Sequence, residues 1–193
     1  ARSVTEKGEE ERERHDGKDI DPDALPLDDQ KVYDLFRHGM TDGVFQFESE
    51  GMKGALTKIK PTRIEDLIAV NAMYRPATMK LIDDYCNHKH GRKAVPSVHP
   101  LVDDILTETY GIMIYQEQVM QVANRLGKFP LSKALTLIKA ISKKKEKFIL
   151  DCGVGFVEGA MSNGIDRKSA EKLYDLVVEF GNYGFNKAHA TRY

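Results

Sequence analysis

Cysteine is nearly absent from this chain, which contains two among its 193 residues. Cys86 and Cys152 lie far apart in the sequence, and neither has the CxxC companion typical of a zinc knuckle. Small disulfide-stapled domains carry several cysteines at short spacings. The sequence therefore excludes a disulfide framework and predicts two free, buried thiols.

Long hydrophobic runs are missing as well. No apolar stretch approaches the roughly 20 residues that a membrane-spanning helix needs, and the charged segment 1–16 lacks the apolar centre of a secretory signal. The hydrophobic fraction of 41% and the charged fraction of 31% are typical of a globular protein with one main domain. We therefore expect a cytoplasmic protein without a membrane partner.

A large net charge is the third absence, because the formal net charge is only -1. The charges are nevertheless unevenly distributed: residues 1–34 contain 12 acids and 6 bases, whereas residues 125–147 contain 8 bases and one acid. A basic segment of this density is typical of phosphate binding. The alternative that stays open is a solvated helix face.

Apolar residues recur at helical spacing along most of the chain, whereas only 44–47 and 110–115 have the composition of strands. Asp29, Ser49 and Asp166 are expected helix caps, and 62–65 has the pattern of a capping box. The fold class predicted is mostly α, an irregular multi-helix domain with small β elements. The expected helices are 28–38, 49–60, 62–73, 99–105, 116–126, 132–141, 154–161 and 166–180.

The helix expected at 132–141 combines an apolar stripe with lysines that continue beyond its end. Lys139 and Lys143 are four residues apart and so share one face. Two ammonium groups in this position repel each other unless an anion lies between them. The pattern favours an anion-binding face, and a solvated lysine face remains the alternative.

A second candidate segment follows the last expected helix. Gly181 and Gly184 permit tight backbone turns that expose Asn186, Lys187 and His189. Such a loop can approach a sugar, a base edge or a phosphate. The alternative is a glycine-rich helix end at which His189 is merely packed.

One group of residues has the types that ligate metals, namely Cys86, His88, His90 and His99. Cys86 and His90 share a helix face, but His88 points elsewhere, and neighbouring lysine and arginine side chains repel a cation. We therefore expect no metal here.

Paired carboxylates occur at 28–29, 83–84 and 103–104. Each pair lies at an expected helix start or on a helix surface, where capping and solvation account for it. We expect no catalytic residue in this chain.

Four sequence blocks, in their order and spacing, resemble one family. They are GVFQFES at 43–49, TYGIMIYQEQVM at 109–120, KKK at 143–145 and GFNKAH at 184–189. From about Asp28 to Tyr193 the chain is similar to the alpha subunit of bacterial replicative DNA polymerase III, a C-family DNA polymerase. The resemblance implies that 28–193 is the first part of the fingers domain, truncated at its C-terminus, and that 1–27 is a charged lead-in at the end of the palm connection.

The resemblance implies that the parent chain is a DNA-directed DNA polymerase and that this fragment alone is inactive. In the family the matching basic helix holds the triphosphate of the incoming nucleotide, which assigns that role to Lys139, Lys143 and Lys144. The loop residues Asn186, Lys187 and His189 would help to place the nucleotide. The chain departs from the family by having Ile138, Ser142 and Ala188 where Arg, Gly and Ser are usual.

Further contacts are also implied. Arg75, in a Tyr-Arg-Pro turn, and Lys145 would touch DNA or nucleotide, although Arg75 is equally suited to pair with Glu65 or Asp66. The expected partners are a deoxynucleoside triphosphate, template-primer DNA and, for the parent enzyme, replisome subunits such as the sliding clamp. The Mg²⁺ ions of the parent would be held by palm aspartates upstream of this segment.

A rival interpretation is a non-enzymatic helical module that uses its basic helix to bind nucleic acid or an acidic protein surface. If the polymerase interpretation is right, we expect the helix 132–141 and the loop 184–189 to converge on one concave surface, because a triphosphate with its sugar is larger than either segment can hold alone.

Overall fold

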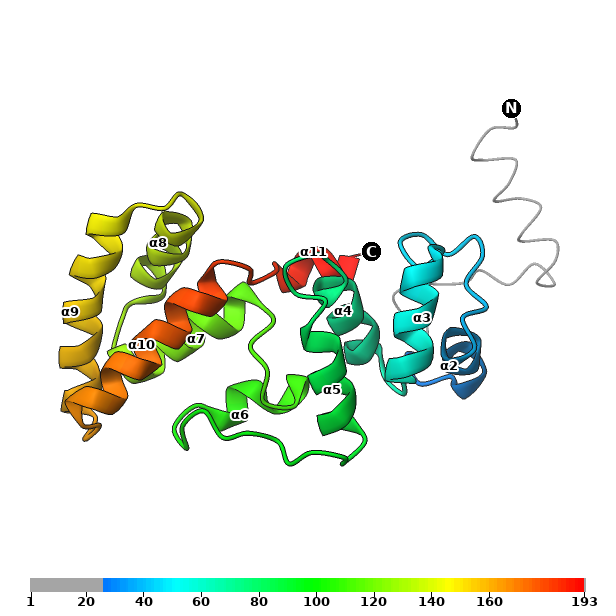
Figure 1. The fold of residues 1–193 in the computed structure, drawn as a ribbon, viewed down its shortest axis with the longest axis horizontal. Coiled ribbons are helices and arrows are strands. Elements are labelled where there is room, and N and C mark those ends of the chain that lie inside the picture. The colour runs from blue at the N-terminus through cyan, green and yellow to red at the C-terminus, as the bar shows by residue number, and fades with distance from the viewer. Residues whose placement is uncertain (1–25, 193) are drawn as a thin grey trace.

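The computed structural model describes residues 26–192, which are mostly helical (Figure 1). None of the helices in this range is long and apolar enough to cross a membrane. The elements are α2 (Gln30–Arg37), α3 (Glu50–Ile59), α4 (Ile64–Met73), α5 (Leu81–Lys89), α6 (Asp103–Leu106), η2 (Thr107–Thr109), α7 (Gln116–Gly127), α8 (Leu131–Ser142), α9 (Glu146–Ser162), α10 (Arg167–Gly181) and α11 (Lys187–Arg192).

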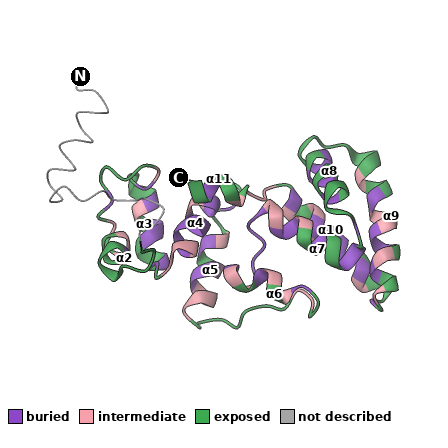
Figure 2. Ribbon diagram, turned by 180° about the vertical axis from the view of Figure 1, so that it is seen from behind, coloured by how far each residue is buried: buried purple, intermediate pink, exposed green. Residues whose placement is uncertain are grey.

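The helices pack around two hydrophobic clusters that follow each other along the long axis of the molecule (Figures 1 and 2). The first cluster lies among α2 to α5 and receives Ile112, Ile114, Tyr115 and, from α11, Ala190. The second lies among α6 to α10. The mostly helical fold class predicted from the sequence is confirmed.

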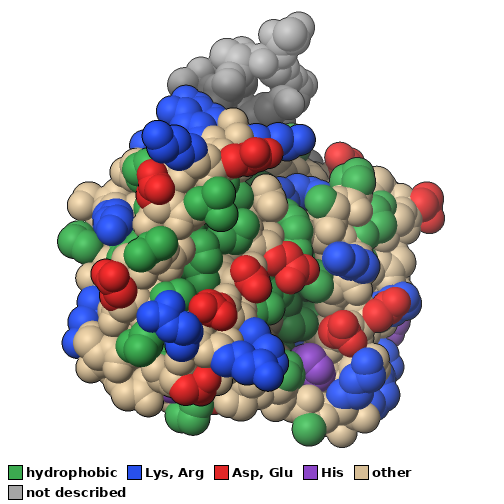
Figure 3. Space-filling view, turned by 60° about the vertical axis from the view of Figure 1, so that its left-hand side comes forward, with side chains coloured by type: hydrophobic (Ala, Val, Ile, Leu, Met, Phe, Trp, Pro, Cys, Tyr) green, Lys and Arg blue, Asp and Glu red, His purple; other side chains and the backbone are tan. Residues whose placement is uncertain are grey.

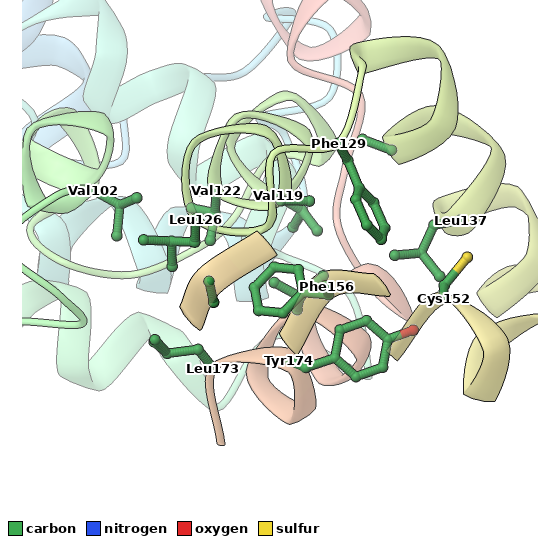
Figure 4. Packing of buried hydrophobic residues seen from close by; sticks show 14 of the residues in the cluster. Val102, Val119, Val122, Leu126, Phe129, Leu137, Cys152, Phe156, Leu173 and Tyr174 are labelled. Atoms are coloured by element: carbon green, nitrogen blue, oxygen red, sulfur yellow. The ribbon is translucent and has the colours of Figure 1, made fainter. Parts of the chain in front are cut away.

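Aromatic rings fill the centre of the second cluster (Figure 4). The ring centroid of Phe156 lies 6.0 Å from that of Phe129 and 5.3 Å from that of Tyr174. The Tyr174 hydroxyl donates a hydrogen bond to the carbonyl of Ile149 at 2.5 Å. The polar end of a buried tyrosine is thus satisfied, and α8, α9 and α10 share one core.

Two glycines allow α7 and α9 to cross closely. A Cβ on Gly127 would lie 2.3 Å from the Phe156 ring, and a Cβ on Gly159 would lie 2.1 Å from the carbonyl oxygen of Gly127. The sequence pattern predicted Gly127 as the residue that ends α7. The left-handed position is instead Lys128, with φ of 55°, and Gly127 is the last helical residue.

The β elements predicted at 44–47 and 110–115 are not strands. Within 26–192, β pairing is limited to one isolated parallel bridge between Tyr115 and Phe185. The amides of Val44 and Phe47 instead bond to carbonyls three residues back, which makes 44–47 a turn. These segments have strand composition, but the described part of the chain offers no neighbouring strand to satisfy their backbone groups.

Helix starts agree with the sequence where the signal is a side-chain cap. Asp29 accepts from Lys31 N at 2.8 Å, Ser49 from Met52 N at 3.3 Å and Asp166 from Ser169 N at 3.0 Å. The expected box at 62–65 is wrong, because α4 begins at Ile64 and the carboxylate of Asp66 accepts from the amide of Thr62 at 2.9 Å.

Other helices differ in extent from the sequence prediction. Helix α9 begins at Glu146 rather than at 154, despite three internal glycines that weaken a helix. The pattern indicated a helix around Cys86 and His90 without giving its bounds, which is α5. It missed α11 and began α6 at 99 rather than at Asp103. In α2 Val32 and Leu35 are exposed, whereas Tyr33 is buried and Phe36 packs against the first cluster.

Candidate functional site

The basic segment forms an exposed turn between α8 and α9. Lys139, Lys143, Lys144 and Lys145 are all exposed, and none forms an ion pair with a carboxylate of residues 26–192. The backbone of Lys144 is left-handed, with φ of 50°, and its amide bonds to the carbonyl of Ile141. The structure therefore places four exposed lysines along the last turn of α8 and the turn that follows it, with Glu146 and Asp151 close to Lys145.

Packing places this lysine turn beside the end of α10. The buried stripe of α8 faces α7, α9 and α10, and its last member, Ile141, touches Gly181 so closely that a Cβ there would lie 2.7 Å from Ile141 Cδ1. The glycine-rich loop therefore starts next to the lysines. The apolar stripe of α8 thus packs against α10.

Arg75 fixes the course of that loop. Its Nη2 donates to the carbonyl of Tyr183 at 2.7 Å, its Nε donates to the carbonyl of Ala72 at 2.9 Å, and its guanidinium lies 4.7 Å from the Phe185 ring centroid. Burial lowers the pKa of Arg75. Arg75 thus bonds main-chain carbonyls and stacks on a ring rather than pairing with Glu65 or Asp66.

The loop ends at a hollow between α3, α4 and α11. His189 lies at its edge, with its ring 5.5 Å from the Phe185 ring. Both polar and aromatic groups face this hollow, a composition suited to a base or sugar. Its lining residues are Gln46, Glu48, Ser49, Met52, Asn71, Tyr74, Arg75, Phe185 and His189.

Lys187 is engaged within the protein. Its Nζ bonds to Glu108 at 2.7 Å and lies 5.5 Å from the Tyr115 ring centroid, and its amide bonds to both carboxylate oxygens of Glu117 at 3.0 and 3.1 Å. Spacing alone did not reveal these acids, which lie 70 or more residues earlier in the chain. Lys187 therefore anchors α11 in this structure.

Asn186 also has a structural contact, because its side-chain oxygen accepts from the amide of His189 at 2.8 Å. This bond satisfies an amide in the first turn of α11. Of the three loop residues predicted to place a nucleotide, His189 is the one that lines the hollow.

The structure thus groups the candidate residues into two sites that do not share one hollow, contrary to the single concave surface expected from the sequence. One is the lysine turn, and the other is the hollow with Arg75, Phe185 and His189. The lysines of α8 do not line this hollow. Nothing in the sequence indicated that Asn71 and Tyr74 line the hollow. The block at 43–49 did point to it, because Gln46, Glu48 and Ser49 form one of its walls.

The carboxylate pairs have partners of their own. Asp83 bonds to Lys58 at 2.6 Å, Asp84 to Lys93 at 3.0 Å, and Asp104 pairs with Arg125. Asp103 accepts from Ser97, Val98 and His99 at the start of α6, which lowers its pKa.

The histidine and cysteine group is likewise dispersed into internal contacts. The rings of His88 and His90 lie within hydrogen-bonding distance of the carbonyls of Tyr110 and Ile59, and Cys86 is a buried free thiol whose pKa is raised by burial. Among residues 26–192 no three His, Cys, Asp or Glu side chains are placed to hold a metal ion. The donor sets described do not fit a magnesium site.

Comparison with known proteins gives a consistent result. Residues 3–164 match the bacterial DNA polymerase III alpha subunit finger domain. The chain is 45% identical over 177 residues to DNA polymerase III subunit alpha of Halalkalibacterium halodurans, which covers 92% of this chain and 16% of that protein.

The same protein of Staphylococcus aureus is 41% identical over 177 residues, covering 92% of this chain and 17% of the relative. The protein of Aquifex aeolicus is 44% identical over 184 residues, covering 94% of this chain and 16% of the relative. The chain thus spans about a sixth of the length of these relatives. By the finger-domain match and the identity of these relatives, the chain belongs to the family of bacterial DNA polymerase III alpha subunits.

Proposed function

We propose that this chain is the fingers segment of a replicative DNA-directed DNA polymerase that binds and positions the incoming deoxynucleoside triphosphate beside template-primer DNA. The observation that carries the proposal is the exposed lysine turn, which lies next to the start of a loop leading to the hollow at His189. Family membership supports the same assignment.

The triphosphate is assigned to Lys139, Lys143 and Lys144, with Lys145 at the edge of the same turn. Mutual repulsion makes this cluster unfavourable until an anion lies among the ammonium groups. The left-handed backbone of Lys144 belongs to the C-terminal turn of α8, where the amide of Lys145 bonds to the carbonyl of Ala140, and it turns the chain so that the lysines face solvent.

The sugar and base are assigned to the hollow at His189. Arg75 and Phe185 form its wall, and DNA would pass close to it. In this proposal Asn186 and Lys187 act indirectly, because they hold α11 and so position His189.

The chemistry of nucleotidyl transfer is assigned to the parent polypeptide, working in the cytoplasm. Its Mg²⁺ ligands would lie outside this chain, where two metal ions would stabilise the attacking and leaving oxygens. Contact with the sliding clamp is inferred for the parent from the family resemblance alone.

The pure chain is expected to extend no primer in the presence of Mg²⁺ and deoxynucleotides, because its carboxylates are engaged in caps and ion pairs. Gel analysis of a labelled primed template measures this. Primer extension that disappears in Asp83→Asn or Asp103→Asn variants would contradict the assignment.

The lysine turn is tested by replacing Lys139, Lys143 and Lys144 with Gln. Affinity for a deoxynucleoside triphosphate should fall, and the salt dependence of DNA binding should flatten by about one unit of slope for each lost phosphate contact. The matched control replaces Lys31, Lys168 and Lys172 with Gln, which removes the same positive charge from exposed positions outside the lysine turn. Equal slopes for the two variants would return the lysines to a solvated face.

The non-enzymatic binding module is distinguished from a nucleotide site by whether the ligand also contacts the hollow at His189. His189→Ala should weaken binding of a deoxynucleoside triphosphate but leave binding of inorganic tripolyphosphate unchanged, because only the former reaches the hollow. If both ligands bind equally well to the wild-type chain and to the variant, a module that binds anions through its basic helix explains the structure better.

A further inference from the structure

A groove between α9 and α10 takes no part in the proposed nucleotide site. It lies at the end of the molecule opposite α2 (Figure 1) and is lined on the α9 side by Ile149, Leu150, Val154 and Val157. Leu150 is 72% exposed and Val154 63% exposed. Large aliphatic side chains this exposed on adjacent turns mark an interaction surface more often than an isolated exposed residue does.

The groove has the shape of a helix-binding channel. Leu150, Val154 and Glu158 recur every four residues along α9, and Glu171 and Asp175 do the same along α10, so that two stripes face each other across the groove. Eight residues of α9 extend about 12 Å at 1.5 Å per residue. This length accommodates about two turns of a docked helix.

The charges around the groove are mostly negative. Glu158, Glu171 and Asp175 are exposed, and none forms an ion pair with a described lysine or arginine. Arg167 is the one cation among the lining residues of 26–192. Figure 3 shows hydrophobic and acidic side chains side by side around a hollow on this face.

This combination selects the kind of partner. Carboxylates repel the phosphates of DNA and of anionic lipids, so the groove is unsuited to either. They attract lysine and arginine, while the apolar floor requires aliphatic side chains from the partner. Both demands are met by a helix with an apolar stripe and basic flanks.

We propose that the α9–α10 groove docks a basic amphipathic helix supplied by a separate protein. The proposal does not depend on nucleotide binding, which uses other residues.

The test is fluorescence anisotropy of a labelled leucine–lysine helical peptide with the whole chain. Saturable binding is expected. A peptide with glutamate in place of lysine, and one with scrambled order, should bind at least about tenfold more weakly. Equal binding of either peptide would overturn the proposal.

Two variants locate the peptide. Leu150→Gln with Val154→Gln should weaken binding about tenfold or more, because burying one such side chain contributes enough for that change. The matched control is Leu35→Gln with Met40→Gln, two exposed apolar residues elsewhere. All four positions are exposed, and circular dichroism verifies that the variants fold. An equal loss in both variants would sink the assignment.

A charge-reversal variant tests whether the acidic side chains of the groove select a basic peptide. Glu171→Lys should reduce binding of the lysine peptide and improve binding of the glutamate peptide, whereas Asp28→Lys, an exposed acid outside the groove, should change neither. If the Glu171→Lys variant still bound the lysine peptide in preference to the glutamate peptide as strongly as the wild type does, the proposal would be contradicted.

Two other occupants give distinct outcomes. Concentration-dependent dimerisation in sedimentation, abolished by the Leu150 and Val154 variant, would show that a second copy fills the groove. Hydroxyl-radical footprinting of the full parent polypeptide is expected to find Leu150 and Val154 accessible. Their protection in the absence of a partner would show that the parent's own chain covers them, which would also overturn the proposal.

Discussion

At the residue scale, the glycines of α7 and α9 show how one missing side chain sets the packing of a domain. Gly159 faces the backbone of Gly127, where a Cβ would lie 2.1 Å from a carbonyl oxygen. A backbone atom cannot rotate aside as a flexible side chain can. The distance between the two helices therefore depends on the absence of a Cβ at Gly159.

We expect Gly159→Ala to lower the free energy of unfolding by about 1–3 kcal/mol, because it overpacks the crossing of α7 and α9. Urea unfolding measures the change. The control is Gly54→Ala in α3, where a Cβ meets nothing within 4 Å and the backbone is helical. That change should stabilise by about 0.5–1 kcal/mol. The same sign for both variants would refute the packing argument.

These glycines also mark a limit of sequence reasoning. Gly127 follows an amphipathic run, so the pattern predicted a helix terminator, which is its commonest role. Its close approach to Phe156 and Gly159 depends on a helix about 30 residues further along. Local spacing carries no information about that crossing.

At the element scale, α4 is tied to α5 by a buried polar network. Asp66 is fully buried and pairs with Lys89, which is 5% exposed, and it accepts from the Tyr85 hydroxyl at 2.9 Å. Burial alone would raise the pKa of Asp66, but hydrogen bonds from Lys89, Thr62 and Tyr85 outweigh it and lower the pKa. The carboxylate is therefore ionised in the folded protein.

We expect Asp66→Asn to lower the free energy of unfolding by about 3–5 kcal/mol, because Lys89 is left buried without its counter-ion. Since the folded pKa of Asp66 lies below the unfolded one, its stabilisation is complete above about pH 4 and is lost as the pH falls through the folded pKa. Unfolding measured across this range should therefore show less acid dependence in the variant.

The control is Asp83→Asn, which removes an ion pair whose side chains are 61% and 68% exposed. Exposed pairs contribute about 0–1 kcal/mol. If Asp66→Asn behaved like Asp83→Asn, or kept the acid dependence of the wild type, the ionised network would not be the tie between α4 and α5.

The helix boundaries also show which sequence signals depend only on residues close by in the chain. Caps at Asp29, Ser49 and Asp166 were predictable because the side chain bonds an amide two or three residues away. Helix α9 was underestimated because Gly153 and Gly155 weaken the pattern. The Cβ position of Gly153 is occupied by the ring of Tyr174 at 2.9 Å, a tertiary contact that outweighs the low helix propensity.

At the scale of the whole molecule, the candidate site depends on contacts between distant segments. The sequence placed the lysines together because they are neighbours in the chain, but the lining of the hollow at His189 contains none of them, so the expected shared surface is not formed there. It did not foresee that Glu108 and Glu117 engage Lys187, because those acids approach only when η2 and α7 pack against α11. Pairings over such separations follow from topology rather than from spacing.

The two hydrophobic clusters are joined where residues 113–116 meet 183–187. The amide of Phe185 donates to the carbonyl of Ile114, and the amide of Gln116 donates to the carbonyl of Phe185, each at 2.9 Å. Arg75 completes the joint from the side of α4 by holding the carbonyl of Tyr183. A single side chain thereby links the first cluster to the loop that leaves the second.

We expect Arg75→Met to lower the free energy of unfolding by about 1–3 kcal/mol, because the apolar stem is kept while the partly buried carbonyls of Ala72 and Tyr183 lose their donors. Hydrogen exchange should accelerate at the amides of Phe185 and Gln116, since the joint opens more often. The control, Arg92→Met, removes an exposed bond to Asn87 and should change neither measurement. Unaltered protection at the joint in Arg75→Met would mean that the main-chain bridge alone holds the two clusters together.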